Sequence, residues 1–125
     1  MRGLAEVAVI ALLMAIPIEI KAQTIASSSP MGKDLLSNCR IALQTWDKTK
    51  DGAVCIAFIQ GFNFGYGFAQ ASREVHSICV SGDVEMRVVV RRVAHFLEGQ
   101  SEEKLRDTPA SLLVMEALEE AYPCH

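Results

Sequence analysis

The stretch Ala53–Ala71, AVCIAFIQGFNFGYGFAQA, is 19 residues long and contains no charged side chain. This is close to the roughly 20 residues that cross a lipid bilayer, so a membrane span is the first alternative to consider. At 100° per residue, however, the amides of Gln60, Asn63 and Gln70 fall on one narrow stripe. Amide side chains would be costly in lipid. The pattern therefore predicts an amphipathic helix around which the rest of a folded domain is arranged.

The face of this helix opposite the amides is apolar and contains two glycines. Its members are Val54, Phe58, Gly61, Phe62, Gly65 and Ala69. Each glycine weakens a helix by about 1 kcal/mol relative to alanine, so we expect a neighbouring helix to cross closely at Gly61 and Gly65. The aromatic side chains are expected mainly in the core. Phe64 and Phe68 lie nearer the polar stripe. For these two rings the alternatives to core packing are a ligand groove, which they would line, and a dimer contact, which they would cover.

Residues 1–22 have the pattern of a secretory signal peptide: a basic residue near the start, the apolar run Val7–Ile16 and then a proline. Cleavage is expected after Ala22, with Ala26 as the alternative. The apolar run is too short to span a membrane comfortably. We therefore predict export, a mature domain of residues 23–125, and no membrane association after cleavage.

The whole chain carries a net charge of −3, and its leader contains as many basic as acidic residues. A weakly acidic chain without a basic cluster argues against nucleic-acid binding. No phosphate-binding glycine loop and no paired nucleophile and base is visible, so we expect neither an enzyme nor a cofactor. A zinc site would need the four residues His76, Cys79, Cys124 and His125. Their spacing matches no compact zinc motif, so we expect no metal.

The four cysteines in the predicted mature chain, Cys39, Cys55, Cys79 and Cys124, indicate two disulfides in an exported protein. A first helix is expected to begin near Ser29-Pro30 and to fold back on the central helix at the polar turn Trp46–Gly52, with Asp51 capping the second helix. This hairpin brings Cys39 close to Cys55.

A third helix is expected to open at Ser81-Gly82-Asp83, and a fourth runs from Pro109 to Tyr122. Cys79 precedes the third helix and Cys124 follows the fourth, so both lie at one end of that hairpin and are expected to pair. The predicted fold class is all-α: a small four- to five-helix bundle stapled by two disulfides.

The longest polar connection between helices is EGQSEEKLRDT, Glu98–Thr108. In one interpretation it is a solvated turn in which Ser101 caps a short helix. In the other it is a protruding acidic segment that enters a partner's cleft. The candidate partner-binding residues are Glu98, Gln100, Ser101, Glu102, Glu103, Lys104, Arg106 and Asp107.

The cysteine framework, with CIAFIQG (Cys55–Gly61), ICV (Ile78–Val80), VVVRRVAHFL (Val88–Leu97) and LEEAYPC (Leu118–Cys124), resembles the Rap/Tai family of immunity proteins. These proteins protect bacteria against amidases delivered by type VI secretion. The resemblance covers essentially the whole mature chain. It departs from the family pattern at Val80, where members commonly carry proline, and after Gly61, where they often carry Asp-Ala.

The resemblance implies a periplasmic, all-helical, non-catalytic protein that binds a peptidoglycan amidase and occludes its active-site cleft, often as a homodimer. The loop that carries the contacts would correspond to some part of Glu98–Thr108 and its flanking helix ends. Two other function classes stay open. One is an acid-stress chaperone of the periplasm, which would expose apolar surface at low pH. The other is a small helical protein that binds a different partner, for example a ligand held in a pocket beside Phe64 and Phe68.

Overall fold

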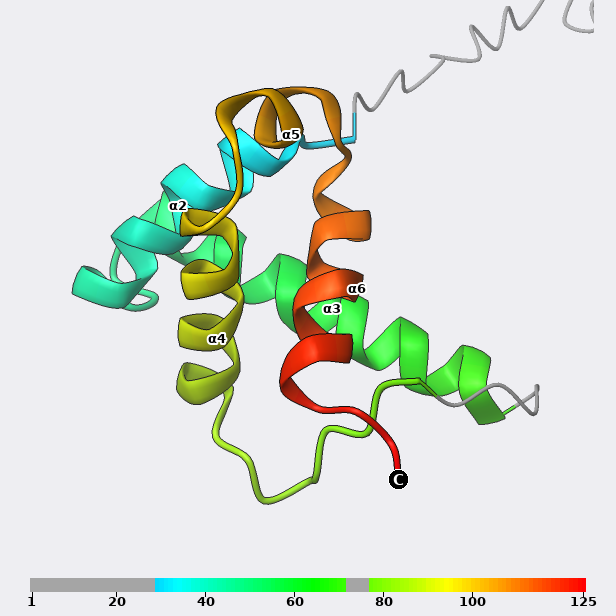
Figure 1. The fold of residues 1–125 in the computed structure, drawn as a ribbon. Coiled ribbons are helices and arrows are strands. Elements are labelled where there is room, and N and C mark those ends of the chain that lie inside the picture. The colour runs from blue at the N-terminus through cyan, green and yellow to red at the C-terminus, as the bar shows by residue number, and fades with distance from the viewer. Residues whose placement is uncertain (1–28, 72–76) are drawn as a thin grey trace, which may run out of the picture.

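The computed structural model describes residues 29–71 and 77–125, and in these residues all regular secondary structure is α-helical. The helices are α2 (Gly32–Thr45), α3 (Lys50–Ala71), α4 (Met86–Glu98), α5 (Glu102–Asp107) and α6 (Ala110–Ala121) (Figure 1). The predicted all-α, disulfide-stapled bundle is confirmed. The predicted signal peptide, residues 1–22, lies outside the described residues.

The core is formed where α2, α4, α6 and the first half of α3 meet. On α4 the valines at positions 89, 90 and 93 and Leu97 are all at most 1% exposed, as the helical spacing of VVVRRVAHFL requires. They pack with the buried leucines and alanines of α2 and α6. Full burial of one such side chain contributes about 2 kcal/mol to stability. No described residue in this core is polar or charged.

Both predicted disulfide pairings are confirmed. Cys39 on α2 is bonded to Cys55 on α3, and both residues are fully buried. Cys79, ahead of α4, is bonded to Cys124, behind α6. By chain entropy the loops of 16 and 45 residues correspond to about 3 and about 4 kcal/mol of stabilisation. The first bridge fixes α2 against α3, and the second joins the two ends of the α4–α6 half.

Several helices begin later than their sequence signals suggested. The first helix begins at Gly32 rather than at Pro30, because the Pro30 carbonyl accepts a hydrogen bond from the Ala110 amide at 2.8 Å. The residues Ser81–Asp83 form a turn, and α4 begins only at Met86. Pro30 is thus bonded to α6, whereas the turn at Ser81–Asp83 is closed locally by a hydrogen bond from the Val84 amide to the Ser81 carbonyl at 3.1 Å.

The start of α3 is capped by a residue other than the predicted Asp51. The Thr49 hydroxyl accepts a hydrogen bond from the Gly52 amide at 3.2 Å, and Asp51 lies inside the first turn. Gly52 is buried, and a Cβ atom there would overlap the Trp46 carbonyl and lie 3.3 Å from the Ala42 Cα. The close α2–α3 crossing therefore depends on Gly52.

The prediction for the buried face of α3 was wrong in part. Phe58 and Phe62 pack against the core, as expected. A neighbouring helix was expected at Gly61 and Gly65, but a Cβ atom at either position would meet nothing within 4 Å. Val54 is exposed, whereas Asn63 and Gln70 of the predicted polar stripe are partly buried. The fully buried side chains of α3 all come from its first half, and its second half extends beyond α6 (Figure 1).

Candidate protein-binding site

The predicted contact segment, Glu98–Thr108, is a folded corner built around α5. After α4 ends, the Gly99 amide donates a hydrogen bond to the Phe96 carbonyl at 3.2 Å. The Ser101 hydroxyl then accepts one from the Lys104 amide at 3.2 Å, which caps the N-terminus of α5. The predicted cap at Ser101, at the start of a short helix, is confirmed. The segment is therefore ordered by its own hydrogen bonds.

A buried leucine anchors this corner to the bundle. Leu105 is 7% exposed and packs against the core. The first turn of α2 lies close to Leu105. A Cβ atom on Gly32 would collide with the Leu113 side chain and would lie 3.1 Å from the Leu105 carbonyl. At the far end, the Gly32 amide donates a hydrogen bond to the Thr108 carbonyl at 3.0 Å. The corner is thus tied to the start of α2 through both its backbone and its buried side chain.

The charged side chains of the corner divide into paired and unpaired groups. Lys104 Nζ lies 2.6 Å from Glu116 Oε2 on α6, and Glu98 forms an ion pair with Arg40 on α2 at 3.4 Å. Arg106 pairs with Asp107 at 2.8 Å. These are exposed pairs of small individual value. Among the described residues, Glu102 and Glu103 make no ion pair.

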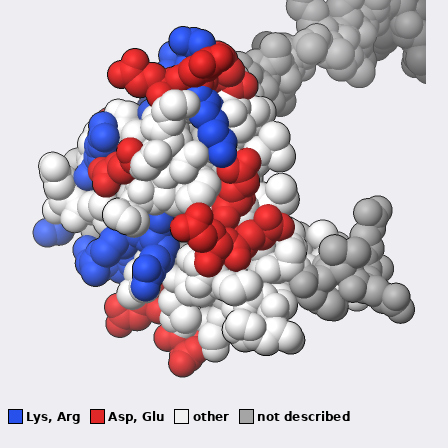
Figure 2. All heavy atoms as spheres, in the orientation of Figure 1, with Lys and Arg blue, Asp and Glu red and all other residues white. Residues whose placement is uncertain are grey.

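The Arg106–Asp107 ion pair shifts the pKa of both side chains. The hydrogen bond from the Arg106 guanidinium lowers the pKa of the Asp107 carboxyl, and the same bond raises the pKa of Arg106. Both groups stay charged over the physiological pH range. The surface of α5 therefore carries fixed charges of both signs. Figure 2 shows acidic and basic side chains gathered at the α5 end of the molecule.

The structure separates the eight predicted contact residues into two sets. Gln100 and Lys104 are half-buried and bonded inward, to the Phe96 carbonyl and to Glu116 respectively. Ser101 is used as a cap, and Glu98 is held by Arg40. Four charged side chains of the segment face outward. Glu102 and Glu103 make no ion pair with a described residue, and Arg106 and Asp107 pair only with each other.

Sequence reasoning missed the contribution of α2 to this surface. Lys33 lies beside Glu102, Leu105 and Arg106, and the four line an open hollow of about 320 Å³. Nothing in the local sequence linked residue 33 to residues so far along the chain. The only available signal was Gly32, a small residue at the start of a helix, which permits that close approach.

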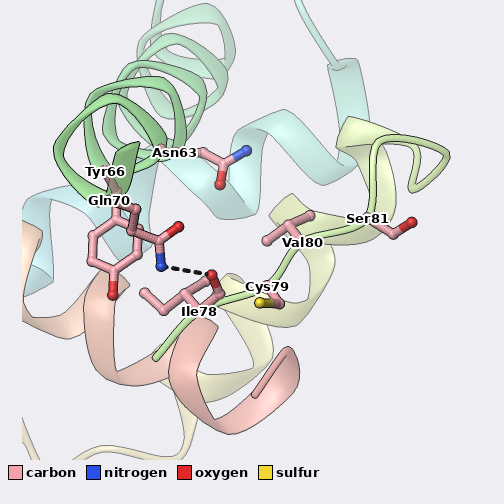
Figure 3. A pocket seen from close by; sticks show the side chains of 8 residues that line it. Asn63, Tyr66, Gln70, Ile78, Cys79, Val80 and Ser81 are labelled. Carbon is pink, nitrogen blue, oxygen red and sulfur yellow. Dashed lines mark hydrogen bonds between the residues drawn. The ribbon is translucent and has the colours of Figure 1, made fainter. Parts of the chain in front are cut away.

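A second hollow, of about 520 Å³, lies between the second half of α3 and the segment Ile78–Ser81 (Figure 3). The Asn63 amide points into it, and Gln70 Nε2 donates a hydrogen bond to the Ile78 carbonyl at 3.0 Å. The Tyr66 hydroxyl is hydrogen-bonded to Ser77. The predicted polar stripe therefore attaches α3 to this segment. Phe64 and Phe68, by contrast, do not line this hollow and are 80% and 76% exposed.

The predicted absence of a zinc site concerned four residues. Cys79 and Cys124 are joined in a disulfide, so neither offers a thiolate to a metal. His76 lies outside the described residues. Within the described part of the chain, no group of three or more His, Cys, Asp or Glu side chains is arranged to hold a metal ion.

One helix in the described residues is long and apolar enough to cross a membrane by length and composition alone, and it is α3. One face of its first half, with Cys55 and Ile59, is buried in the bundle, and Cys55 is bonded to Cys39 of α2. That half would have to leave the core before the helix could enter lipid.

The family model of the Rap1a immunity proteins matches residues 31–124. The match includes all five described helices and both disulfides. No curated protein and no solved structure matches the chain. The match covers well over half of the chain, from the start of α2 to the last cysteine. This chain belongs to the Rap1a immunity protein family.

Proposed function

We propose that this protein is a periplasmic immunity protein that binds a peptidoglycan amidase delivered by type VI secretion and occludes its active-site cleft. Family membership indicates a toxin-inhibiting role. Two disulfides and the absence of free cysteines among the described residues are typical of exported proteins. The predicted signal peptide, residues 1–22, agrees with that location. Inhibition by binding requires no catalytic group of the protein's own.

The observation that carries the proposal is the rigidity of the α5 corner. An inhibitor that inserts a surface feature into a cleft binds more tightly when that feature is ordered beforehand, because ordering it on binding would cost free energy. Here the feature is capped by Ser101, anchored by Leu105 and tied to α2 through Gly32. Its outward residues are charged and make few bonds to the rest of the bundle.

Charge on the corner would act mainly on the rate of encounter. Glu102 and Glu103 are exposed and make no ion pair with a described residue, so they can steer the corner toward a positively charged cleft rim. Glu98 and Asp107 are already compensated by Arg40 and Arg106. We therefore assign steering to two of the four acidic residues of the segment.

The test is binding to, and inhibition of, amidases from type VI secretion systems by the purified exported protein. A cognate pair should bind tightly and lose hydrolysis of peptidoglycan in a one-to-one titration. The variant Glu102→Ala/Arg106→Ala should weaken binding about 10- to 100-fold, as expected for central interface residues. The control Asp47→Ala/Lys50→Ala, at the opposite end of α2, should bind as the original protein does.

The steering role has its own readout. Glu102→Gln/Glu103→Gln should slow association and flatten its dependence on salt, while dissociation changes little. Unchanged association rates in this variant would contradict steering. Full inhibition by the Glu102→Ala/Arg106→Ala variant at unchanged affinity would show that another surface contacts the toxin.

The acid-stress chaperone alternative finds no support in the described core. No buried residue there is charged, so protonation at low pH breaks no buried ion pair that would open the bundle. No specific observation favours a small-ligand function at Phe64 and Phe68 either, because both side chains project into solvent.

A further inference from the structure

The exposed face of α4 is basic along most of its length. Arg87, Arg91, Arg92 and His95 are exposed on this helix, and it contains no acidic residue before Glu98. The opposite, apolar face is buried in the core, so only the basic face meets solvent. Figure 2 shows basic side chains gathered over the first turns of α4. Positive charge is therefore concentrated on one surface of a chain whose net charge is −3.

The energetics of the helix itself do not explain this arrangement. Arg87 lies in the first turn of α4, where the positive end of the helix dipole disfavours a cation. Arg91 follows four residues later, and like charges at that spacing repel each other along a helix. Within the described residues, neither guanidinium forms an ion pair. An anion bound between the two arginines would remove both penalties.

Arg87 is held in place by the only tryptophan of the chain. Its Cζ atom lies 4.3 Å from the centroid of the Trp46 ring, which is a cation–π contact. A guanidinium held over a ring still presents N–H donors at its edge. No hydrogen bond to another described residue uses the donors of Arg87. This guanidinium is thus preorganised for a planar anion such as a carboxylate.

Trp46 has a backbone conformation that favours glycine. Its φ is 57° and its ψ is −125°, and the Lys48 amide donates a hydrogen bond to the Thr45 carbonyl at 3.2 Å. These are the features of a type II′ turn, in which glycine dominates the first central position. The ring of Trp46 is only half-buried against the core, so burial offsets only part of the strain. Strained residues of this kind cluster at binding and switch sites.

We propose that Trp46, Arg87 and Arg91 form a binding site for an acidic peptide segment of a protein partner. The two arginines lie one turn apart, about 6 Å at the helix surface. In an extended peptide, side chains two residues apart lie on the same side and about 7 Å from each other. Two such carboxylates match the two guanidiniums, and each pair forms charge-assisted hydrogen bonds. The peptide covers the exposed edge of the Trp46 ring.

The composition of the site favours a peptide over a larger polyanion. Binding to an anionic membrane takes a cluster of about 4–8 basic residues or an apolar helix face free to enter lipid, and the apolar face of α4 is buried. Nucleic acid requires a more extended basic surface than this weakly acidic chain offers. Tryptophan and arginine are instead the residues most enriched at the energetic centre of protein–protein contacts.

This inference is independent of the proposed toxin contact. Arg87 lies eleven residues before Glu98, about 16 Å along the helix axis at about 1.5 Å per residue. Figure 1 shows α5 at the other end of α4 from its first turn. Amidase inhibition through the α5 corner can therefore hold while the peptide site fails, and the peptide site can hold while the toxin contact fails.

The test is titration of the purified exported protein with a synthetic peptide, followed by calorimetry and by the fluorescence of Trp46, the only tryptophan. The probe is an acetylated and amidated peptide of three Glu-Ser repeats, and the matched control peptide has glutamine in place of each glutamate. At about 0.05 M salt, the glutamate peptide should change the emission of Trp46 and bind with a dissociation constant below about 1 mM. The glutamine peptide should have no effect.

Variants of α4 separate recognition from general attraction. Arg91→Gln should weaken binding of the glutamate peptide about 10-fold, because one charge-assisted pair is lost. Arg91→Lys keeps the charge but not the planar fork, so it should restore only part of the affinity. The control Arg92→Gln removes the same charge from the side of α4 that faces α6, and affinity should change less than about twofold. Circular dichroism should show all three variants to be folded, because both arginines are exposed.

Three outcomes would overturn the inference. The glutamate peptide could fail to bind at concentrations up to about 10 mM. Arg91→Gln and Arg92→Gln could weaken binding equally, which would show attraction by net charge alone. The protein could also ignore the peptide but bind vesicles of phosphatidylglycerol in a manner dependent on Arg87 and Arg91, and that result would assign the site to a membrane surface.

Discussion

The two halves of α3 have similar compositions and opposite environments. The first half contains all the fully buried residues of the helix, Gly52, Cys55 and Ile59. The second half, from Gln60 to Ala71, contains none. Both halves are apolar and both contain glycine, yet only the first is fixed in the core and bonded to α2 through Cys39–Cys55.

This difference shows that a glycine in an apolar helix has no single meaning. Gly52 is required because the Trp46 carbonyl and the Ala42 backbone come within the space of a Cβ. Gly61 and Gly65 face open space in the chain itself. A glycine permits a close approach at that position, and only the structure shows whether a neighbour makes one.

The largest expected effect compares truncations in the two halves. Ile59 is fully buried, so Ile59→Ala should leave a cavity in the core and lower the free energy of unfolding by about 3 kcal/mol. Phe64→Ala, in the second half, should leave monomer stability within about 0.5 kcal/mol. Urea unfolding of both variants, at concentrations too low for association, measures the difference. Equal losses would mean that the second half is packed in the monomer.

The glycines themselves give the next largest contrast. Gly52→Ala should destabilise the protein by about 1–3 kcal/mol through overpacking against the α2–α3 turn. Gly61→Ala should instead stabilise the monomer by up to about 1 kcal/mol, because alanine favours the helix and meets no neighbour. Thermal unfolding of dilute samples distinguishes them. A destabilising Gly61→Ala would reveal an approach within the monomer that the structure does not contain.

The attachment of the second half can be weakened selectively. Tyr66→Phe removes the hydrogen bond between the Tyr66 hydroxyl and Ser77 and should cost about 0.5–1.5 kcal/mol. Hydrogen exchange should rise mainly in the second half of α3, since the first half is bonded elsewhere. The control Tyr122→Phe removes a buried hydroxyl that has no hydrogen-bond partner among the described residues, and it should not destabilise the protein. Faster exchange throughout α3 would show that its two halves open together.

Much of the fold was predictable because it follows from strong local and pairwise signals. The helical spacing of Val89, Val90, Val93 and Leu97 identified the buried side of α4. The positions of Cys39 and Cys55 relative to one turn identified the first bridge, which the structure confirms. This pairing depends only on the two cysteines lying at similar distances from the turn that joins α2 and α3.

The orientation of α3 was not predictable from its own pattern. Its amides were expected on a stripe opposite the packed face, but the Gln70 amide bonds the Ile78 carbonyl and Asn63 points into the hollow beside Val80. In a helix that is apolar nearly all round, a few amides cannot decide which side meets the core. Long-range backbone partners decide it.

In the candidate site, too, some features could be predicted from the local sequence and others could not. Ser101 as a cap could be predicted from the sequence, because a serine three residues before Lys104 suits the start of a short helix. The anchoring of α5 by Leu105 and its closeness to Lys33 could not. Both depend on how α2 crosses the corner, which no local pattern specifies.

The central claim is that the α5 corner faces the toxin. Hydrogen–deuterium exchange of the protein, alone and with a cognate amidase, tests this most directly. We predict that the amidase slows exchange in Glu98–Thr108 and leaves Gly61–Ala71 unchanged. Protection of Gly61–Ala71 by the amidase, with Glu98–Thr108 unaffected, would contradict the account.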